Sequence, residues 1–318
     1  MGAVRLSVII PVKQDARLAG CLAALATQTF DRSQFEIIVV DNGPDPSAGS
    51  LARLASARYL VHLDGGSYSA RARGTGEAHG NILVFTDADC VPARSWLATI
   101  SRIFDDPLCQ VVIGPSESTE ASVLSSWVQD IDESRWQIAS KMDRTAYCDT
   151  RNLAIRREVL DQIPFDPAFL HAGDLDLGLR LYEAGIHIRT EPSLRIRHDH
   201  PRSLRALLRR GMRRGRGLAQ LERKHGVFLG PIAERPLVVA GWDLKSTVLN
   251  WGRRPVGRAL IIGVVVASLA PLTGALFALA RIPGANALGA DLFVTFERLT
   301  LLLGRMLGAT GATRMRGP

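Results

Sequence analysis

The sequence is poor in cysteine, and its cysteines are widely spaced. Among 318 residues there are four, at positions 21, 90, 109 and 148, and no two of them form a CxxC pair. This spacing argues against a disulfide-built scaffold and favours a reducing compartment. The beginning of the chain also lacks the pattern of a secretory signal peptide, because the apolar run at residues 6–12 is short and contains Pro11. We therefore expect no cleaved leader.

Two further absences narrow the function. No GxGxxG follows the first apolar segment, which speaks against a dinucleotide-binding dehydrogenase. The arginine-rich stretch at residues 202–224 has no interleaved aromatic side chains, which weakens a nucleic-acid-binding interpretation. Although the formal net charge is +8, we expect no nucleic-acid partner. The positive charge instead suggests an anionic lipid surface or a phosphate-bearing substrate.

The composition is that of a folded protein with a large core. Hydrophobic residues make up 47% of the chain, and its length suits one domain of roughly 200–250 residues with an appendage. The sequence changes character from residue 202, where it becomes dense in arginine, and residues 259–280 then form a long uncharged run. We predict a main domain over residues 1–225 and a helical region over residues 226–318.

Short apolar, β-branched segments alternate with segments of helical periodicity. The expected strands are residues 6–12, 35–40, 58–63, 81–86 and 110–113, and the expected helices are residues 17–28, 50–57, 70–79, 96–104 and 174–184. Residues 151–162 predict the edge of a strand running into a helix, whereas residues 116–149 are mixed. The alternation predicts an α/β fold with a doubly wound, mostly parallel sheet. Polar residues after the first, second and fourth strands then lie together at the ligand-binding edge.

Two carboxylates, Asp87 and Asp89, stand one residue apart at the end of a buried strand. Mg²⁺ and Mn²⁺ prefer oxygen ligands and often bridge protein carboxylates to substrate phosphates. Asp89 is the expected metal ligand, with Asp87 beside it contacting a ribose or a bridging water. A polar strand-to-loop turn is the structural alternative.

Four other polar positions carry a chemical interpretation beside a structural one. Asp41 either contacts a nucleotide base or forms an Asx turn before Gly43, and Arg71 either approaches a diphosphate or lies on a solvated helix face. Asp174 is either a general base or a helix cap. His198 either binds a metal together with a second histidine two residues later or belongs to a polar loop.

The C-terminal third has two features that suggest a membrane. Residues 202–224 predict a basic amphipathic helix that lies on anionic lipid, contacts a diphosphate or is simply solvated. Residues 259–280 carry no charge over 22 positions, which is long enough to cross a hydrocarbon core. A re-entrant hairpin around Pro271, with residues 292–307 in the interface, and a buried helical hairpin are the alternatives.

Taken together, the motifs resemble those of the family-2 glycosyltransferases, which have the GT-A fold. The resemblance covers roughly residues 5–220. Its pieces, in the family's order, are SVIIPV at residues 7–12, VVDNG at 39–43, the segment 70–80 running into Asp87-Ala88-Asp89, residues 152–157, Phe165-Asp166-Pro167, and GDLDL at 173–177 with Arg180.

The resemblance implies a role for each matched residue. On the donor side, Asp41 and Asn42 are the implied contacts of the base, and Pro11 and Val12 line its pocket. Arg71, Asp87 and Ala88 are implied to surround the ribose and the diphosphate. Asp89 is the implied metal ligand. His198 completes the metal or diphosphate environment. On the acceptor side, Asp174 is the implied catalytic base, with Asp176 and Arg180 in the same motif. Two positions depart from the family pattern. Ala72 stands where the family has Asn, and Gly173 stands where it has Glu.

The implied reaction is a metal-dependent single displacement that inverts the anomeric configuration. The expected cofactor is Mn²⁺ or Mg²⁺, and the expected donor is a nucleotide-sugar, with UDP as the default nucleotide and a hexose as the sugar. A lipid-linked or envelope glycan is the expected acceptor, with the enzyme at the inner membrane and its catalytic domain facing the cytoplasm. The alternative is a non-catalytic nucleotide-sugar-binding or scaffolding component, which the departures at Ala72 and Gly173 keep open.

Overall fold

The computed structural model describes residues 4–119 and 122–225, together with single helical positions at 268, 269, 271, 272, 296, 299, 300 and 303. Contacts divide the chain into two units. The first unit consists of Met1–Thr119 and Glu133–Asp199, and the second consists of Glu120–Asp132 and His200–Pro318. Each unit is described separately. The domain boundary expected at residue 225 stays a prediction.

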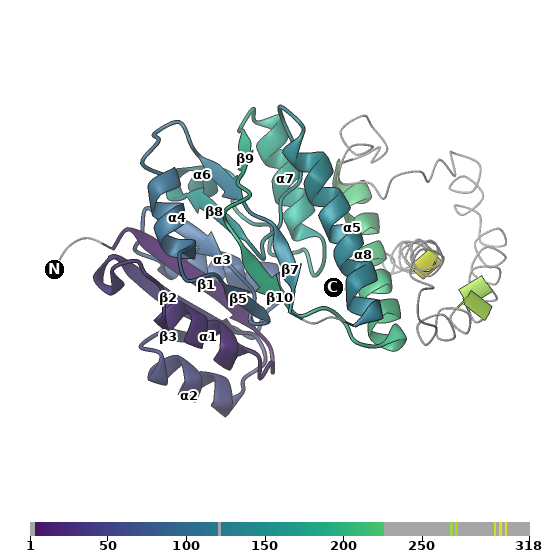
Figure 1. The fold of residues 1–318 in the computed structure, drawn as a ribbon, viewed down its shortest axis with the longest axis horizontal. Helices are drawn as coiled ribbons and strands as arrows, with labels where there is room; N and C mark the ends of the chain where they lie inside the picture. The colour runs from purple at the N-terminus through teal and green to yellow at the C-terminus, as the bar shows by residue number, and fades with distance from the viewer. Residues whose placement is uncertain are drawn as a thin grey trace, which may run out of the picture. The chain divides into compact units, whose positions relative to one another are not determined.

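A seven-stranded sheet forms the centre of the first unit (Figure 1). Its strands, in spatial order, are β3 (Arg58–Val61), β2 (Phe35–Asp41), β1 (Leu6–Val12), β4 (Ile82–Phe85), β8 (Leu153–Arg156), β6 (Val111–Ile113) and β9 (Ile188–Thr190). All neighbouring pairs are parallel except the two that involve β8, which runs antiparallel to β4 and β6. The predicted α/β class with a mostly parallel sheet is confirmed. The reversed strand at its centre was not foreseen.

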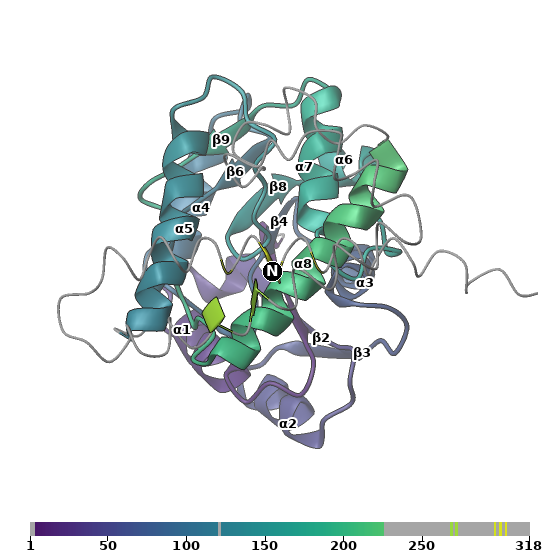
Figure 2. The ribbon, with the colours of Figure 1, turned by 90° about the vertical axis from the view of Figure 1, so that its right-hand side faces the viewer.

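Helices cover both faces of this sheet because successive strand residues point in opposite directions. They are α1 (Leu18–Ala26), α2 (Pro46–Leu54), α3 (Ser67–Glu77), α4 (Trp96–Ile103), α6 (Arg157–Gln162) and α7 (Gly173–Glu183), with a 3-10 turn η1 at Arg32–Gln34. Leu6, Val8 and Ile10 of β1 join one core cluster with buried residues of α1, α2 and α4. Ile9 faces the other side, toward Gly74 of α3. Figure 2 shows α1 and α4 on one side of the strands and α3 on the other.

The expected helix at residues 50–57 was placed too late in the sequence. Helix α2 begins at Pro46, and the Asp45 side chain caps it by accepting a hydrogen bond from the Ser47 N–H at 2.9 Å. Aspartate at the N-cap followed by proline in the first turn is a strong start signal. Apolar periodicity alone misses that signal, because the first turn carries few apolar residues.

A second, three-stranded sheet lies in the first unit with the order β5 (Cys90–Pro92), β10 (Ile196–His198), β7 (Ser116–Ser118). Strand β10 is antiparallel to β5 and parallel to β7. The register places His198 opposite Cys90. This pairing joins two segments that lie more than 100 positions apart in the chain.

The second unit contains α8 (Leu204–His225) and the first part of α5 (Val123–Ser140), a helix that spans the division between the units. Trp127 and Val128 of α5 and Leu207 of α8 form an apolar cluster with Leu269, Phe296 and Leu303. On the exposed side of α8 lies a cationic stripe, defined as Arg205, Arg209, Arg213 and Arg216. None of these four side chains has an ion-pair or hydrogen-bond partner among the residues that the structure describes.

No helix within the described part of the chain is both long enough and apolar enough to cross a membrane. Apart from four positions, the predicted membrane segment at residues 259–280 lies outside the described residues, as does most of the amphipathic segment at 292–307. Both stay predictions.

All four cysteines are free and buried. Burial raises the pKa of the thiols of Cys21, Cys90, Cys109 and Cys148. They are therefore protonated, unreactive packing residues at neutral pH, and the expectation of a protein without disulfides is confirmed.

Candidate active site

The carboxyl ends of β1, β2 and β4 lie at one edge of the sheet, as the strand pattern predicts. Val12 pairs in register with Asp41, and Ile9 pairs with Phe85 just before the Asp87-Ala88-Asp89 segment. Because β8 is antiparallel, it starts at this same edge, with Leu153 opposite Phe85. The residues that precede β8 are thereby brought to the ends of the parallel strands.

Asp41 is fully buried at the end of β2. Its carboxylate accepts hydrogen bonds from the N–H groups of Gly43 at 2.9 Å and Asp45 at 3.0 Å, and from the Tyr59 hydroxyl at 2.7 Å. Burial, together with Asp41, raises the pKa of Tyr59 to about 12, so this hydroxyl is a stable donor. The Asx turn that was the alternative interpretation is therefore present. A base contact by Asp41 stays a prediction.

The neighbouring donor-side residues are arranged around the same strand ends. Pro11 and Val12 are buried, Asn42 is half-buried, and the Asn42 N–H donates to the Val12 carbonyl at 3.0 Å. Ala88 is buried in the core behind the edge. The structure thus places these residues at or behind the strand ends, and their contacts with a nucleotide stay predictions.

Arg71 of α3 is only 2% exposed and forms an ion pair with Asp87. This position excludes the solvated helix face that was the alternative for Arg71. Its Nε and Nη1 atoms are buried without a hydrogen-bond partner in the described part of the chain, and its guanidinium lies 5.1 Å from the centroid of the Tyr68 ring. Burial raises the pKa of Asp87, while the charge of Arg71 opposes the rise.

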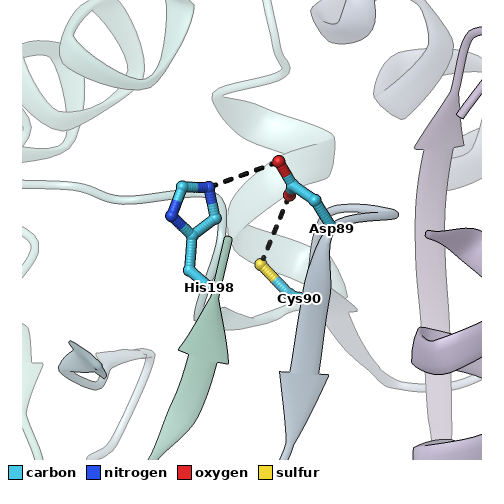
Figure 3. A group of neighbouring side chains, drawn as sticks. All are labelled: Asp89, Cys90 and His198. Carbon is cyan, nitrogen blue, oxygen red and sulfur yellow. Dashed lines mark hydrogen bonds and ion pairs between the residues drawn. The ribbon is translucent and has the colours of Figure 1, made fainter. Parts of the chain in front are cut away.

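Asp89, Cys90 and His198 form a compact cluster of candidate metal-binding side chains (Figure 3). The His198 Nε2 atom lies 3.4 Å from one carboxylate oxygen of Asp89, and the Cys90 Sγ atom lies 3.8 Å from the other. The β5–β10 pairing produces this arrangement by setting His198 across from Cys90. The second predicted histidine, His200, is instead within 3.0 Å of Gln129 in the second unit.

The donor set suits a divalent cation of the Mn²⁺ or Mg²⁺ class. Burial by itself raises the pKa of Asp89, but the hydrogen bond and charge of His198, with Arg17 and Arg151, bring it down to about 2. The carboxylate is therefore charged at neutral pH, as a ligand must be. The thiol of Cys90 is held neutral by burial, which leaves oxygen and nitrogen as the ready donors. Asp89 and His198 thus fit the predicted metal site.

Sequence analysis did not identify two arginines that lie beside this cluster, Arg17 and Arg151. Arg17 lies 3.5 Å from Asp89 and 2.9 Å from Asp199, and Arg151 pairs with Asp149 at 2.5 Å while lying 3.4 Å from His198. Arg17 precedes α1 and Arg151 precedes β8, so each is a single polar residue without a local motif. Only the antiparallel direction of β8 could have indicated Arg151.

Asp174 lies in the first turn of α7, and one of its oxygens accepts a hydrogen bond from the Leu175 N–H at 2.9 Å. Burial, and then the charge of Asp149, raise the pKa of Asp174. Asp176, two residues later, is fully buried and bound by Arg180 at 2.7 Å. That pair is internal to the helix, so substrate contacts by Asp176 and Arg180 stay predictions.

Comparisons with known proteins agree with this geometry. The profile of the family described as "Glycosyltransferase like family 2" matches residues 4–217. The chain is 30% identical over 228 residues to glycosyltransferase AglE of Haloferax volcanii, covering 68% of this chain and 73% of that protein. It is 26% identical over 274 residues to the pre-mycofactocin glycosyltransferase of Mycobacterium tuberculosis, covering 81% of this chain and 56% of that protein. The chain therefore spans little more than half the length of the second relative.

Solved structures share the fold. A mannosyltransferase from Pyrobaculum calidifontis, solved with GDP-Man and Mn²⁺, has a TM-score of 0.64 at 22% identity and covers 99% of this chain and 89% of its own. Glucosyl-3-phosphoglycerate synthase from Mycobacterium tuberculosis, solved with Mn²⁺ and UDP-glucose, has a TM-score of 0.54 at 19% identity, over 70% of this chain and 80% of its own. The family profile matches more than half of the chain, and AglE is 30% identical over 68% of it. The chain belongs to glycosyltransferase family 2.

Proposed function

We propose that this protein transfers a hexosyl unit from a nucleotide-diphosphate sugar, with UDP as the first nucleotide to test, to an acceptor hydroxyl with inversion at the anomeric carbon. The main support for this proposal is the position of Arg71. Its guanidinium is paired with Asp87, on the predicted donor side, and its charge also acts on Asp174, the predicted base. The two halves of the expected reaction centre are therefore within electrostatic reach of one buried cation.

On the donor side, Asp89 and His198 would hold the metal, and Asp87 would lie beside the ribose. A divalent cation there supplies Lewis-acid stabilisation of the leaving diphosphate. Arg71 adds positive charge at the same place. Two of its buried nitrogens have no partner in the described part of the chain, and a phosphate oxygen would satisfy them.

On the acceptor side, Asp174 would remove the proton of the attacking hydroxyl. Its raised pKa suits this role because a general base works best when its pKa approaches the working pH. A single attack opposite the leaving group inverts the anomeric configuration. The Gly173 departure leaves the base itself in place.

The test is release of free nucleotide diphosphate from a panel of UDP- and GDP-sugars with Mn²⁺ or Mg²⁺, with EDTA as control. We expect metal-dependent release, lowered roughly 10²–10⁴-fold in Asp174→Asn, as is usual for loss of a general base. Donor binding, measured by calorimetry, should persist in the variant. Equal turnover in Asp174→Asn would remove Asp174 as the base. Donor binding without turnover for any acceptor tested would support the binding-only alternative instead.

The proposed acceptor is a lipid-linked or envelope glycan, reached from a catalytic domain that faces the cytoplasm at the inner membrane. Two features support this proposal. The sequence contains the uncharged run at residues 259–280, and α8 presents the cationic stripe. Anionic lipid is a natural partner for basic helices that lack aromatic side chains. NMR of the product's anomeric proton, once an acceptor is found, tests inversion directly.

A further inference from the structure

The ring of Tyr68 lies directly against the start of α7. A Cβ atom added at Gly173 would come within 2.6 Å of the Tyr68 Cγ, 2.7 Å of Cδ2 and 2.9 Å of Cδ1. These distances are too short for any side chain. The aromatic ring therefore occupies the space beside Asp174 that a residue larger than glycine would need.

The hydroxyl of Tyr68 reaches Asp174 at the end of this ring. Burial and the charge of Asp174 help raise the pKa of the Tyr68 hydroxyl, and the Tyr68 hydroxyl lowers the pKa of Asp174. The start of α7 beside this ring has no side-chain cap, because its N-cap residue, Ala172, makes none and has the left-handed conformation with φ 60° and ψ 23°. The first N–H groups of a helix lack intrahelical acceptors. The Tyr68 ring therefore packs against a helix start that has no side-chain cap of its own.

The Tyr68 ring is held firmly in place. It is 7% exposed, its centroid lies 6.3 Å from that of Phe165, and the Arg71 guanidinium lies 5.1 Å from it. Its hydroxyl consequently has little freedom to move away from the Asp174 carboxylate. Two residues of α3 thus act on the two carboxylates: Arg71 pairs with Asp87, and Tyr68 acts on Asp174.

We propose that Tyr68 is a positioning residue that orients the carboxylate of Asp174 for proton removal, and that Gly173 is the residue that makes room for it. This inference rests on the proposed function, in which Asp174 is the base. It also explains the departure at Gly173. The position is glycine because the tyrosine ring lies where a side chain would project.

The charges around Asp174 give the sign of the expected effect. It is faced by Asp149 and the Cys148 thiol from the segment before β8, and by Tyr68 and Arg71 from α3. Burial and Asp149 raise the pKa of Asp174, whereas the Tyr68 hydroxyl, the Leu175 N–H and Arg71 lower it. Removing the hydroxyl should therefore raise this pKa further. The carboxylate form would then be lost at a higher pH.

The experiment compares Tyr68→Phe with wild type and with Tyr182→Phe. Tyr182 lies on the same helix as Asp174, but its ring packs on Arg144, so it controls for loss of a tyrosine hydroxyl. The first readout is the ¹³C carboxyl titration of Asp174 in aspartate-labelled protein, assigned by the signal missing in Asp174→Asn. We expect Tyr68→Phe to raise the pKa of Asp174 by about one unit and Tyr182→Phe to leave it unchanged.

The second readout is the pH profile of nucleotide release. In Tyr68→Phe its acidic limb should move to higher pH by the same amount, with kcat about tenfold lower and the donor KM unchanged. If Tyr68→Phe shifts neither the titration of Asp174 nor the acidic limb of the pH profile, the proposal is overturned. A different outcome, in which the titration differs between Tyr68→Phe and wild type but wild type shows no turnover, would contradict the proposed function and leave the Tyr68–Asp174 interaction supported.

A stability cycle tests the Gly173 contact without any reaction. Gly173→Ala should lower the thermal midpoint in wild type and lower it much less in a Tyr68→Ala background, where the added Cβ meets no ring. Equal losses in both backgrounds would show that the ring does not determine the residue at 173.

Discussion

Asp89 is the residue on which the metal assignment depends. Its charged carboxylate faces His198 at 3.4 Å, and in the proposed site its loss removes a metal ligand. Replacing even an outer-shell partner of a metal typically weakens affinity 10–100-fold. We predict that Asp89→Asn weakens Mn²⁺ binding in the presence of UDP by about 100-fold or more.

Calorimetry with Mn²⁺ and UDP measures this change. Asp105→Asn is the matched control, because Asp105 is an exposed carboxylate that pairs with Arg5, just before the first residue of β1, at the opposite edge of the sheet. It should bind the metal like wild type. Unchanged affinity in Asp89→Asn would move the metal away from the cluster at Asp89.

Single residues were predictable where a strand end placed them. Asp41, Asp87 and Asp89 follow buried parallel strands, and the rule that ligands gather at carboxyl ends was enough to group them. Tyr68 and Arg151 were not found, because their partners come from distant segments and no local motif marks them. Arg71 was found, but its burial was not, since helical position alone does not tell which face packs on the sheet.

At the scale of elements, α3 is set unusually close to the sheet. A Cβ at Gly74 would lie 2.6 Å from Ile9 Cγ2 and 3.1 Å from Val40 Cγ2. We predict that Gly74→Ala lowers the free energy of unfolding by about 1–3 kcal/mol, the usual cost of overpacking a core. The same displacement would shift Tyr68 and Arg71, which lie on this helix.

Urea unfolding followed by circular dichroism gives the comparison. Gly76→Ala, two positions along the same helix, is the control, because nothing lies within 4 Å of a Cβ there. It should stabilise the protein by about 0.4–1 kcal/mol through helix propensity and chain entropy. A destabilising effect of equal size at both positions would indicate that helix α3 does not depend on close contact with β1.

The long strands and most helices were predictable from periodicity, as was the three-residue β6, whereas three other short strands were not. Strands β5, β7 and β9 have three residues each, too few for an alternating pattern to appear. Helix α5 was missed because its apolar residues are interspersed with serine and acidic residues. The reversed direction of β8 cannot be read from its apolar run, since a buried strand is equally apolar in either direction.

At the scale of the whole molecule, the cationic stripe of α8 predicts a preference for anionic membranes. Each arginine near such a surface contributes about 1 kcal/mol, so four give several hundredfold if they act together. We predict that replacing Arg205, Arg209, Arg213 and Arg216 with Gln greatly reduces the ratio of binding to phosphatidylglycerol-containing over purely zwitterionic vesicles.

Vesicle co-sedimentation of the full chain at two salt concentrations measures this ratio. The control replaces four exposed arginines of the first unit, Arg53, Arg73, Arg94 and Arg102, and removes the same total charge. Because a ratio is compared, an apolar anchor elsewhere in the chain does not mask the result. An equal loss in both variants would indicate net charge, and not the stripe, as the cause.

Because the four cysteines are buried, the rate at which each thiol is labelled reports how often the structure around it opens. A thiol-specific reagent reaches Cys21, Cys90, Cys109 or Cys148 only when the surrounding core separates. Cys90 belongs to the candidate metal-binding cluster, and the charge of Asp174 acts on the thiol of Cys148. The order in which the four thiols are labelled therefore shows which parts of the structure around them open first. A bound nucleotide or metal that stabilises the candidate site should slow the labelling of Cys90 and Cys148 and leave that of Cys21 and Cys109 unchanged.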